Sequence, residues 1–203
     1  MKISSDFEIQ IKIVIIGDTG VGKTNFIFQF ADGKFVEIHM ATVGFDFKSR
    51  IIKLPKSQKS VKLQVWDTAG QERYMSLNKN LFQKVQGIIL MYDLTKRDSF
   101  ENITNWLNIV NQNVTNKTTV LIGNKLDLAE EQRKVTEEEG KKFAKDNHLL
   151  FFEGSASTGE NVEEIFAVMA EKIYNNLMGD NDTSMNSVQL NKKKGKDKKS
   201  GCC

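Results

Sequence analysis

The sequence predicts an α/β domain with a doubly wound, mostly parallel sheet and helices on both of its faces. Runs rich in β-branched residues alternate along the chain with helical patterns, as in a succession of βα units. Near-continuous apolar runs such as IVII (13–16) and GIIL (87–90) fit strands that are covered on both faces. Two successive strand-like runs around the only proline, Pro55, predict a hairpin that adds one antiparallel edge strand.

Six strand-like runs follow one another along the chain, separated for the most part by helical patterns, which gives a six-stranded sheet. Short runs of isoleucine, valine, leucine and phenylalanine predict strands at 9–16, 45–54, 61–67, 87–93, 118–125 and 149–154. Apolar residues at helical spacing predict helices at 22–31, 99–112, 137–147 and 161–177. The third of these helices has a further start signal, because Thr136 precedes three acidic residues, Glu137, Glu138 and Glu139.

Length and composition indicate one globular domain followed by a tail. The chain has 203 residues, 39% of them hydrophobic and 27% charged, and we expect residues 1–178 to form the domain. From 179 to 203 the sequence is polar and lysine-rich, which predicts a disordered tail. No apolar run suits a transmembrane helix or a secretory signal, so we expect the protein to be made and kept in the cytosol.

The positive charge is concentrated in the tail. The net charge is +3, but residues 191–203 carry six lysines against Asp197, which leaves the preceding 190 residues slightly acidic. A nucleic-acid-binding domain is expected to be basic itself, so we predict no nucleic-acid partner. A cytosolic membrane surface is the better match for a basic tail.

The first motif is a glycine-rich loop between a strand and a helix. The stretch from Gly17 to Thr24 reads GDTGVGKT and matches GxxxxGK[ST] at the position where that motif binds phosphate. The glycines let backbone amides approach phosphate oxygens, Lys23 would reach the β and γ oxygens, and the Thr24 hydroxyl would bind Mg²⁺. The alternative is an ordinary glycine-rich turn beside a lysine.

The second motif, DTAGQE, follows the predicted strand 61–67. Asp67 therefore lies at the carboxyl end of a strand beside the phosphate loop, where a carboxylate would hold Mg²⁺ directly or through water. Gly70 would let a backbone amide approach the γ-phosphate, and Gln71 would orient the attacking water. The alternative for Gln71 is a solvated loop residue.

The third motif, NKLD, spans Asn124 to Asp127 at the end of another strand. A carboxylate at Asp127 would accept from the N1 and N2 hydrogens of guanine, whereas adenine presents an acceptor at N1. The three motifs together therefore predict binding of GTP rather than ATP.

These residues resemble the Ras superfamily of small GTPases. The chain resembles the Rab branch of that superfamily over about residues 8–177, in the stretches GDTGVGKT, ATVGFDF, WDTAGQERY, GNKLDL and EGSASTGENVEEIF. The resemblance implies the P-loop GTPase fold, with bound GTP or GDP and Mg²⁺. It implies that Thr42 closes over the metal, that residues 70–82 form the second switch, and that Phe35 stacks on guanine, the alternative for Phe35 being a core ring.

Catalysis is assigned to Lys23 and Gln71, and Mg²⁺ to Thr24, Thr42 and Asp67. Nucleotide binding is assigned to Thr19, Gly20, Val21, Gly22, Lys23, Thr24, Asn25, Phe35, Thr42, Gly70, Asn124, Lys125, Asp127, Ser155, Ala156 and Ser157.

The sequence departs from the Rab pattern at two sites. Ser157 stands where a lysine usually contacts guanine, although backbone contacts to the base can survive. The resemblance also implies an effector-reading trio, which here would be Phe47, Trp66 and Leu81 rather than three aromatic residues.

The leading functional hypothesis is a regulated GTPase that hydrolyses GTP slowly, with a monomeric GTPase domain. It implies an exchange factor, a GTPase-activating protein, an extraction factor or prenylation escort, and effectors. A binding scaffold with negligible hydrolysis is an alternative, and a metabolic P-loop kinase or ATPase is another. The NKLD motif argues against the last.

The chain ends in KKKGKDKKSGCC. The resemblance implies geranylgeranyl groups on Cys202 and Cys203, and two lipid chains or one chain with a basic segment anchor a protein stably. The alternative is a pair of exposed reduced thiols. Lipidation would place the protein on the cytoplasmic face of intracellular membranes, with a cytosolic pool, in a role in vesicle trafficking.

Overall fold

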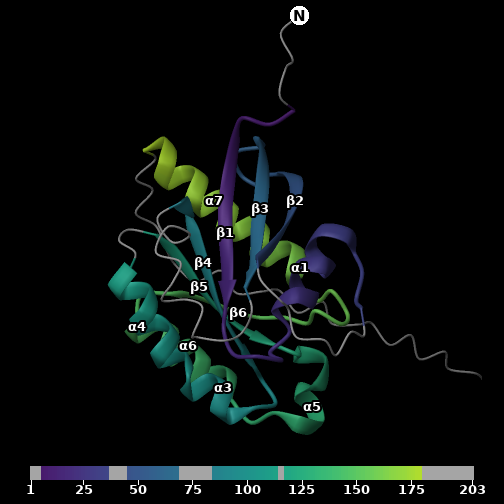
Figure 1. Ribbon diagram of the computed structural model, residues 1–203, viewed down its shortest axis with the longest axis vertical. Helices are drawn as coiled ribbons and strands as arrows, with labels where there is room; N and C mark the ends of the chain where they lie inside the picture. Colours follow the sequence, from purple (N-terminus) through teal and green to yellow (C-terminus); the bar gives the residue numbers. More distant parts are fainter. Residues whose placement is uncertain (1–5, 37–44, 69–83, 114–116, 180–203) are drawn as a thin grey trace, which may run out of the picture.

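The computed structural model describes residues 6–36, 45–68, 84–113 and 117–179 (Figure 1). The strands are β1 (Ile9–Ile16), β2 (Phe45–Lys53), β3 (Ser60–Thr68), β4 (Gly87–Asp93), β5 (Thr118–Asn124) and β6 (Leu150–Glu153). The helices are α1 (Lys23–Asp32), α3 (Arg97–Glu101), α4 (Ile103–Asn113), the 3₁₀ turn η2 (Leu126–Leu128), α5 (Ala129–Gln132), α6 (Glu137–Asp146) and α7 (Val162–Met178).

The strands form one sheet in the order β2-β3-β1-β4-β5-β6. β1 pairs in parallel with β3 and with β4, β5 pairs in parallel with β4 and β6, and β2 alone is antiparallel, at the edge beside β3. The predicted six-stranded, mostly parallel sheet with one antiparallel edge strand is therefore confirmed, and it agrees with the P-loop GTPase fold.

Burial explains why the central strands read as continuous apolar runs. All seven residues of β4 are buried, and so are the last four residues of β1. Both strands have neighbours on each side and helices on each face, so polar residues along them would lose contact with water. Polar groups gather instead where these strands end.

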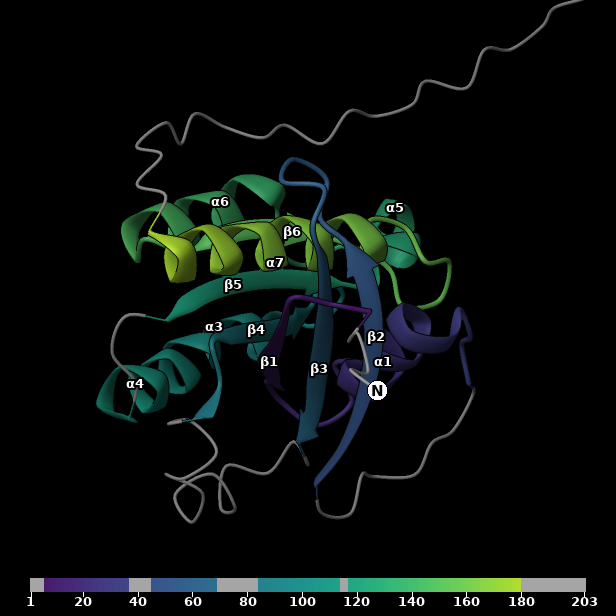
Figure 2. The same cartoon turned by 90° about the horizontal axis from the view of Figure 1, so that it is seen from above.

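Helices cover both faces, as predicted (Figures 1 and 2). On one face α1 and α7 pack over the sheet, and the rings of Phe30 and Phe166 stack with centroids 3.9 Å apart. On the other face α3, α4 and α6 pack around Phe100 and Trp106, and the Phe100 ring lies 4.9 Å from Tyr92 of β4. The two cores fix the sheet between rigid layers.

The hairpin of β2 and β3 is fastened to α7 at its turn. Glu171 of α7 is 5% exposed, and its two carboxylate oxygens accept from the backbone amides of Lys56 and Ser57 at 2.9 and 3.1 Å. These bonds satisfy a buried carboxylate that has no cationic partner among the residues that the structure describes. The turn therefore keeps a defined position at the end of the sheet far from the carboxyl ends of the parallel strands.

The helix predicted at 99–112 is wrong in one respect, because the structure divides it into α3 and α4 at Asn102. The carbonyl of Asn102 accepts from the amides of Asn105 at 3.0 Å and Trp106 at 3.2 Å, so the first turn of α4 is bonded to this junction. The short η2 and α5 after β5 were not predicted. The capped start of α6 is confirmed, since Thr136 and Glu139 form a reciprocal capping box.

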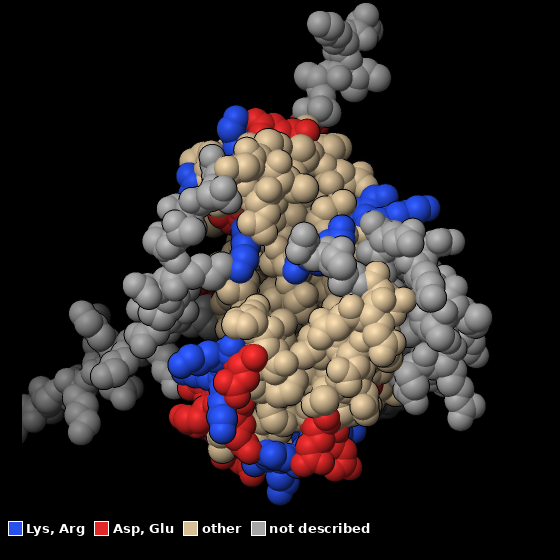
Figure 3. All heavy atoms as spheres, turned by 90° about the vertical axis from the view of Figure 1, so that its left-hand side faces the viewer, with Lys and Arg blue, Asp and Glu red and all other residues tan. Residues whose placement is uncertain are grey.

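The face that carries α4 is largely uncharged in its middle, with charged side chains gathered toward its ends (Figure 3). The 11 residues of α4, ITNWLNIVNQN, include no acidic or basic residue. Within the described ranges, no helix is both long enough and apolar enough to cross a bilayer.

Candidate functional site

The loop between β1 and α1 is the centre of the site, and glycines give it its shape. Gly17 has φ 147°, and a Cβ there would lie 2.1 Å from the backbone oxygen of Met91. Gly22 has φ 99°, and a Cβ there would lie 2.3 Å from the side-chain nitrogen of Asn124. Neither close approach is possible for a residue with a side chain, so the loop packs tightly against the ends of β4 and β5.

Lys23 begins α1 and turns its side chain back into this loop. The residue is 5% exposed, and Nζ donates to the carbonyl oxygens of Gly17 and Asp18 at 2.8 and 2.7 Å. Burial lowers the pKa of Lys23 to about 8, although the negative charges of Asp67 and Asp18 partly oppose this. The ammonium group is therefore held inside the loop with less solvation than it would have in water, which favours the approach of an anion.

Thr24 and Asp67 are brought together from distant parts of the chain. The Thr24 hydroxyl, in the first turn of α1, donates to Oδ2 of Asp67 near the end of β3 at 2.6 Å. Asp67 is 5% exposed. A hydroxyl and a carboxylate side by side are the hard oxygen ligands that Mg²⁺ prefers, so the residues present fit this ion.

Asn124 joins two segments of the site. It is 1% exposed, its side-chain nitrogen donates to the Val21 carbonyl at 2.8 Å, and its side-chain oxygen accepts from the Ala156 amide at 3.1 Å. Both ends of the amide are therefore used within the protein. The contribution of Asn124 is to hold the phosphate loop and the loop after β6 in register.

Lys125 and Asp127 extend from the end of β5 and are each held by a partner. Lys125 adopts a left-handed backbone conformation with φ 69°, and its Nζ lies 2.6 Å from Oδ2 of Asp93, which is fully buried. Asp127 is exposed, and its Oδ1 accepts from the Ser155 hydroxyl at 2.5 Å. The Asp127 carboxylate is therefore accessible while its orientation is fixed from behind.

Ser155 organises the loop that follows β6. Its hydroxyl is buried, and besides donating to Asp127 it accepts from the amides of Ser157 and Thr158, each at 3.1 Å. Ala156 is buried beside it, and Ser157 is exposed. The loop thus presents backbone next to Asp127, as a base-binding loop requires.

The remaining predicted nucleotide-binding residues lie around this centre. Thr19 and Gly20 are exposed at the tip of the phosphate loop, and the Asn25 side chain accepts from the Val36 amide at 3.4 Å. Phe35 is 44% exposed. It is therefore not a core ring, and the alternative reading of this residue is wrong.

Two of the three predicted effector residues contact each other. Phe47 of β2 is paired in register with Trp66 of β3, and their rings lie 4.9 Å apart at 37°. Phe47 is 44% exposed, so the pair offers an aromatic surface on the outer hairpin. Leu81 is outside the described residues, as are Thr42, Gly70, Gln71, Cys202, Cys203 and the tail from 180 onward.

Sequence reasoning missed two acidic residues of the site. Asp93 ends β4, and a carboxylate at the carboxyl end of a parallel strand is a signal that could have found it. Asp18 occupies a variable position of the glycine-rich motif, so the motif gave no reason to single it out. Its contacts depend on a helix that lies more than eighty positions further along the chain.

The residues described so far can bind a phosphate chain at the loop and Lys23, a divalent cation at Thr24 and Asp67, and a base at Asp127 and the loop after β6. These three places lie at the carboxyl ends of β1, β3, β5 and β6, on one edge of the sheet. A comparison with protein-family models gives a match to the Ras family over residues 12–175. The matched range runs from within β1 to within α7 and so contains the whole site.

Proposed function

This chain belongs to the Ras family of small GTPases, and on that premise we propose that it is a Rab-like GTPase that alternates between GDP-bound and GTP-bound states. The observation that carries the nucleotide chemistry is the hydrogen bond of 2.6 Å between Thr24 and Asp67. It joins the phosphate loop to the end of β3 through the two oxygen ligands that a nucleotide-bound Mg²⁺ requires.

In this proposal Lys23 supplies the fixed positive charge of the reaction. Its ammonium group already occupies the loop, where two carbonyl oxygens hold it, and it would stabilise negative charge on the β and γ oxygens. Thr24 and Asp67 would hold Mg²⁺, which neutralises charge on the phosphates when it is bound.

Base selection rests on Asp127. Ser155 fixes one oxygen of this carboxylate, so the exposed group keeps one orientation without a cationic partner among the contacts described. A pre-oriented acceptor pairs well with the two donors of guanine and poorly with adenine, which has an acceptor at N1.

The first experiment is nucleotide competition on the purified protein. Loading with labelled GDP should be prevented by GTP and not by an equal concentration of ATP. Comparable competition by ATP would contradict the guanine assignment.

The second experiment tests turnover, which the sequence assigns to Gln71. Replacement by leucine should slow phosphate release in a single turnover without much loss of GTP binding, because the residue acts on water rather than on the bound phosphate. A matched control is Gln112→Leu, an exposed glutamine on α4. Equal rates of release by wild type and Gln71→Leu would reject this role of Gln71. If wild-type protein releases no phosphate at all, the chain is a non-hydrolysing scaffold.

The Rab-like part of the proposal concerns membranes and partners. It is supported by the resemblance, by the two C-terminal cysteines after a lysine-rich segment, and by the exposed aromatic pair of Phe47 and Trp66. The protein would be geranylgeranylated on Cys202 and Cys203, reside on the cytoplasmic face of intracellular membranes with a cytosolic pool, and recruit effectors in vesicle trafficking. Its cycle would depend on an exchange factor, a GTPase-activating protein, and an extraction factor or prenylation escort.

Membrane attachment has its own test. Replacing both cysteines with serine should move the protein from the membrane to the soluble fraction of its native cell while GDP binding is retained. Unmodified cysteines in mass spectra of native protein would rule out the lipid anchor.

A further inference from the structure

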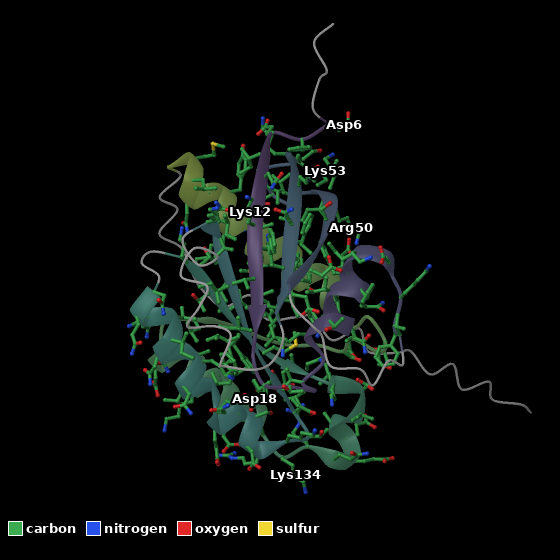
Figure 4. All side chains as sticks on the ribbon, in the orientation of Figure 1. Asp6, Lys12, Asp18, Arg50, Lys53 and Lys134 are labelled. Atoms are coloured by element: carbon green, nitrogen blue, oxygen red, sulfur yellow. The ribbon has the colours of Figure 1, made fainter. Side chains whose placement is uncertain are left out.

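Asp18 connects the phosphate loop to the helical layer on one face of the sheet. Its Oδ1 accepts from the side-chain nitrogen of Asn102 at 2.5 Å and from the indole nitrogen of Trp106 at 2.7 Å. Figure 4 shows Asp18 at the lower end of β1, over the region of α3. One carboxylate oxygen thus bonds to the junction of α3 and α4 and to the first turn of α4.

Both donors are fixed by their own surroundings. Trp106 is 1% exposed and belongs to the core beneath α4. The side-chain oxygen of Asn102 accepts from the side chain of Asn105 at 2.6 Å, which orients the opposite end of the amide toward Asp18. The carboxylate therefore bonds to a rigid layer rather than to another loop.

The backbone of the same residue contacts the ammonium group of the site. The Asp18 carbonyl accepts from Lys23 Nζ at 2.7 Å. A displacement of Asp18 would therefore move an acceptor of Lys23 as well as the loop itself. The charge of its carboxylate also favours the protonated form of Lys23.

The loop between β1 and α1 is intrinsically flexible, so the hydrogen bonds of Asp18 can restrict its conformation. Three of its six residues, 17 to 22, are glycine, the residue with the greatest freedom of the backbone. Long-range side-chain hydrogen bonds reach the loop at Asp18, from Asn102 and Trp106, and at the Val21 carbonyl, from Asn124. A loop fixed in advance loses less entropy when a phosphate binds.

We propose that Asp18 is a positioning residue of the phosphate loop, which holds the loop against Asn102 and Trp106 in the form that retains bound nucleotide. This inference rests on the proposed function, in which the loop binds the phosphates of GDP and GTP. Asp18 touches no reacting atom in this proposal and acts through the backbone of the loop and through Lys23.

The test is a set of variants measured for GDP release. Asp18→Ala removes both bonds and should release labelled GDP about tenfold faster, the usual scale for hydrogen bonds to a charged group. Trp106→Phe removes one donor and keeps most of the packing, so it should accelerate release about threefold. Asp18→Asn retains an acceptor oxygen and should restore part of the slow release.

The double variant separates the tether from independent effects. If the indole acts through Asp18, adding Trp106→Phe to Asp18→Ala should change release little further. Independent, multiplied effects of the two substitutions would contradict the proposal. If Asp18→Ala does not fold, Trp106→Phe and Asp18→Asn still test the proposal, because unchanged GDP release in both variants would overturn it.

A control distinguishes positioning from general loss of stability. Glu171→Gln replaces another carboxylate that accepts from two N–H groups, at the opposite end of the sheet, and so weakens those two bonds. It should lower the urea midpoint of unfolding and leave GDP release unchanged. If Glu171→Gln accelerates release as much as Asp18→Ala, the effect of Asp18 is only structural. If wild-type protein does not bind GDP at all, the proposed function fails, whereas unaltered release from variants that do bind GDP refutes this inference alone.

Discussion

The buried ammonium group of Lys23 should make the nucleotide-free protein less stable than a variant with an uncharged side chain at this position. Lys23 is 5% exposed, and burial lowers its pKa from 10.5 to about 8. Replacing it with methionine removes the charge and keeps a side chain of similar length. We expect Lys23→Met to raise the free energy of unfolding of nucleotide-free protein near neutral pH.

The magnitude follows from the two pKa values. Between pH 8 and 10.5 the unfolded chain binds more protons at this lysine than the folded protein does, so stability rises with pH through that window. The lowered pKa of Lys23 corresponds to a loss of about 3 kcal/mol in the free energy of unfolding when the lysine is protonated in both states. About 2 kcal/mol of this loss should be regained between pH 7 and 9.5. At pH 7 the substitution also leaves the carbonyls of Gly17 and Asp18 without this donor, which costs about 1 kcal/mol each, so the net gain is about 1 kcal/mol.

The assay is urea unfolding of nucleotide-free protein at several pH values, in parallel for wild type and variant. The free energy of wild type relative to Lys23→Met should rise by about 2 kcal/mol from pH 7 to 9.5. A matched control, the exposed Lys145 replaced by methionine, keeps Lys23 and should keep this rise. If Lys23→Met is less stable than wild type at pH 7, and the difference in the free energy of unfolding between the two does not change with pH, the predicted effect of burying the Lys23 charge is refuted.

Three further expectations concern the ends of the parallel strands. Asn124→Ala should cost about 2 to 5 kcal/mol in urea unfolding, because it leaves a buried carbonyl and a buried amide without a partner, and it should accelerate GDP release. Gly17→Ala should destabilise more than Gly33→Ala, since a Cβ at Gly17 would lie 2.1 Å from the Met91 backbone oxygen while one at Gly33 meets nothing within 4 Å; equal unfolding midpoints would argue against that clash. Asp127→Asn should shift competition binding from guanine toward xanthine nucleotides, whose C2 oxygen suits an amide donor, and an unchanged preference would place this carboxylate away from the base.

The fold could be predicted because its signals are local. The apolar run at 87–93 corresponds to β4 residue for residue, and β1 also has the predicted bounds. Strands that are buried on both faces must be apolar throughout, so the pattern in the chain directly reports their environment. The start of α6 was recognised for a similar reason, since Thr136 and Glu139 cap each other within one helical turn.

The unpredicted features depend on residues that are far apart in the sequence. The break at Asn102 interrupts a pattern that is apolar at helical spacing on both sides, and its side chain bonds to Asp18, 84 positions away. The pairing of Lys125 with the buried Asp93 likewise requires two strand ends to lie side by side. Local periodicity carries no information about such partners, whereas the motifs located Lys23 because their spacing already encodes a strand, a loop and a helix.

The hydrogen bond between Trp106 and Asp18 gives the protein an internal optical reporter. The chain has two tryptophans, and only Trp106 touches the phosphate loop among the contacts described, whereas Trp66 packs against Phe47 on the outer hairpin. Indole emission responds to the polarity of its surroundings and to bonding at its nitrogen. In a Trp66→Phe background, the single remaining indole, that of Trp106, would follow the loop from within the core, so loading and release of nucleotide could be recorded in real time without a fluorescent label on the nucleotide.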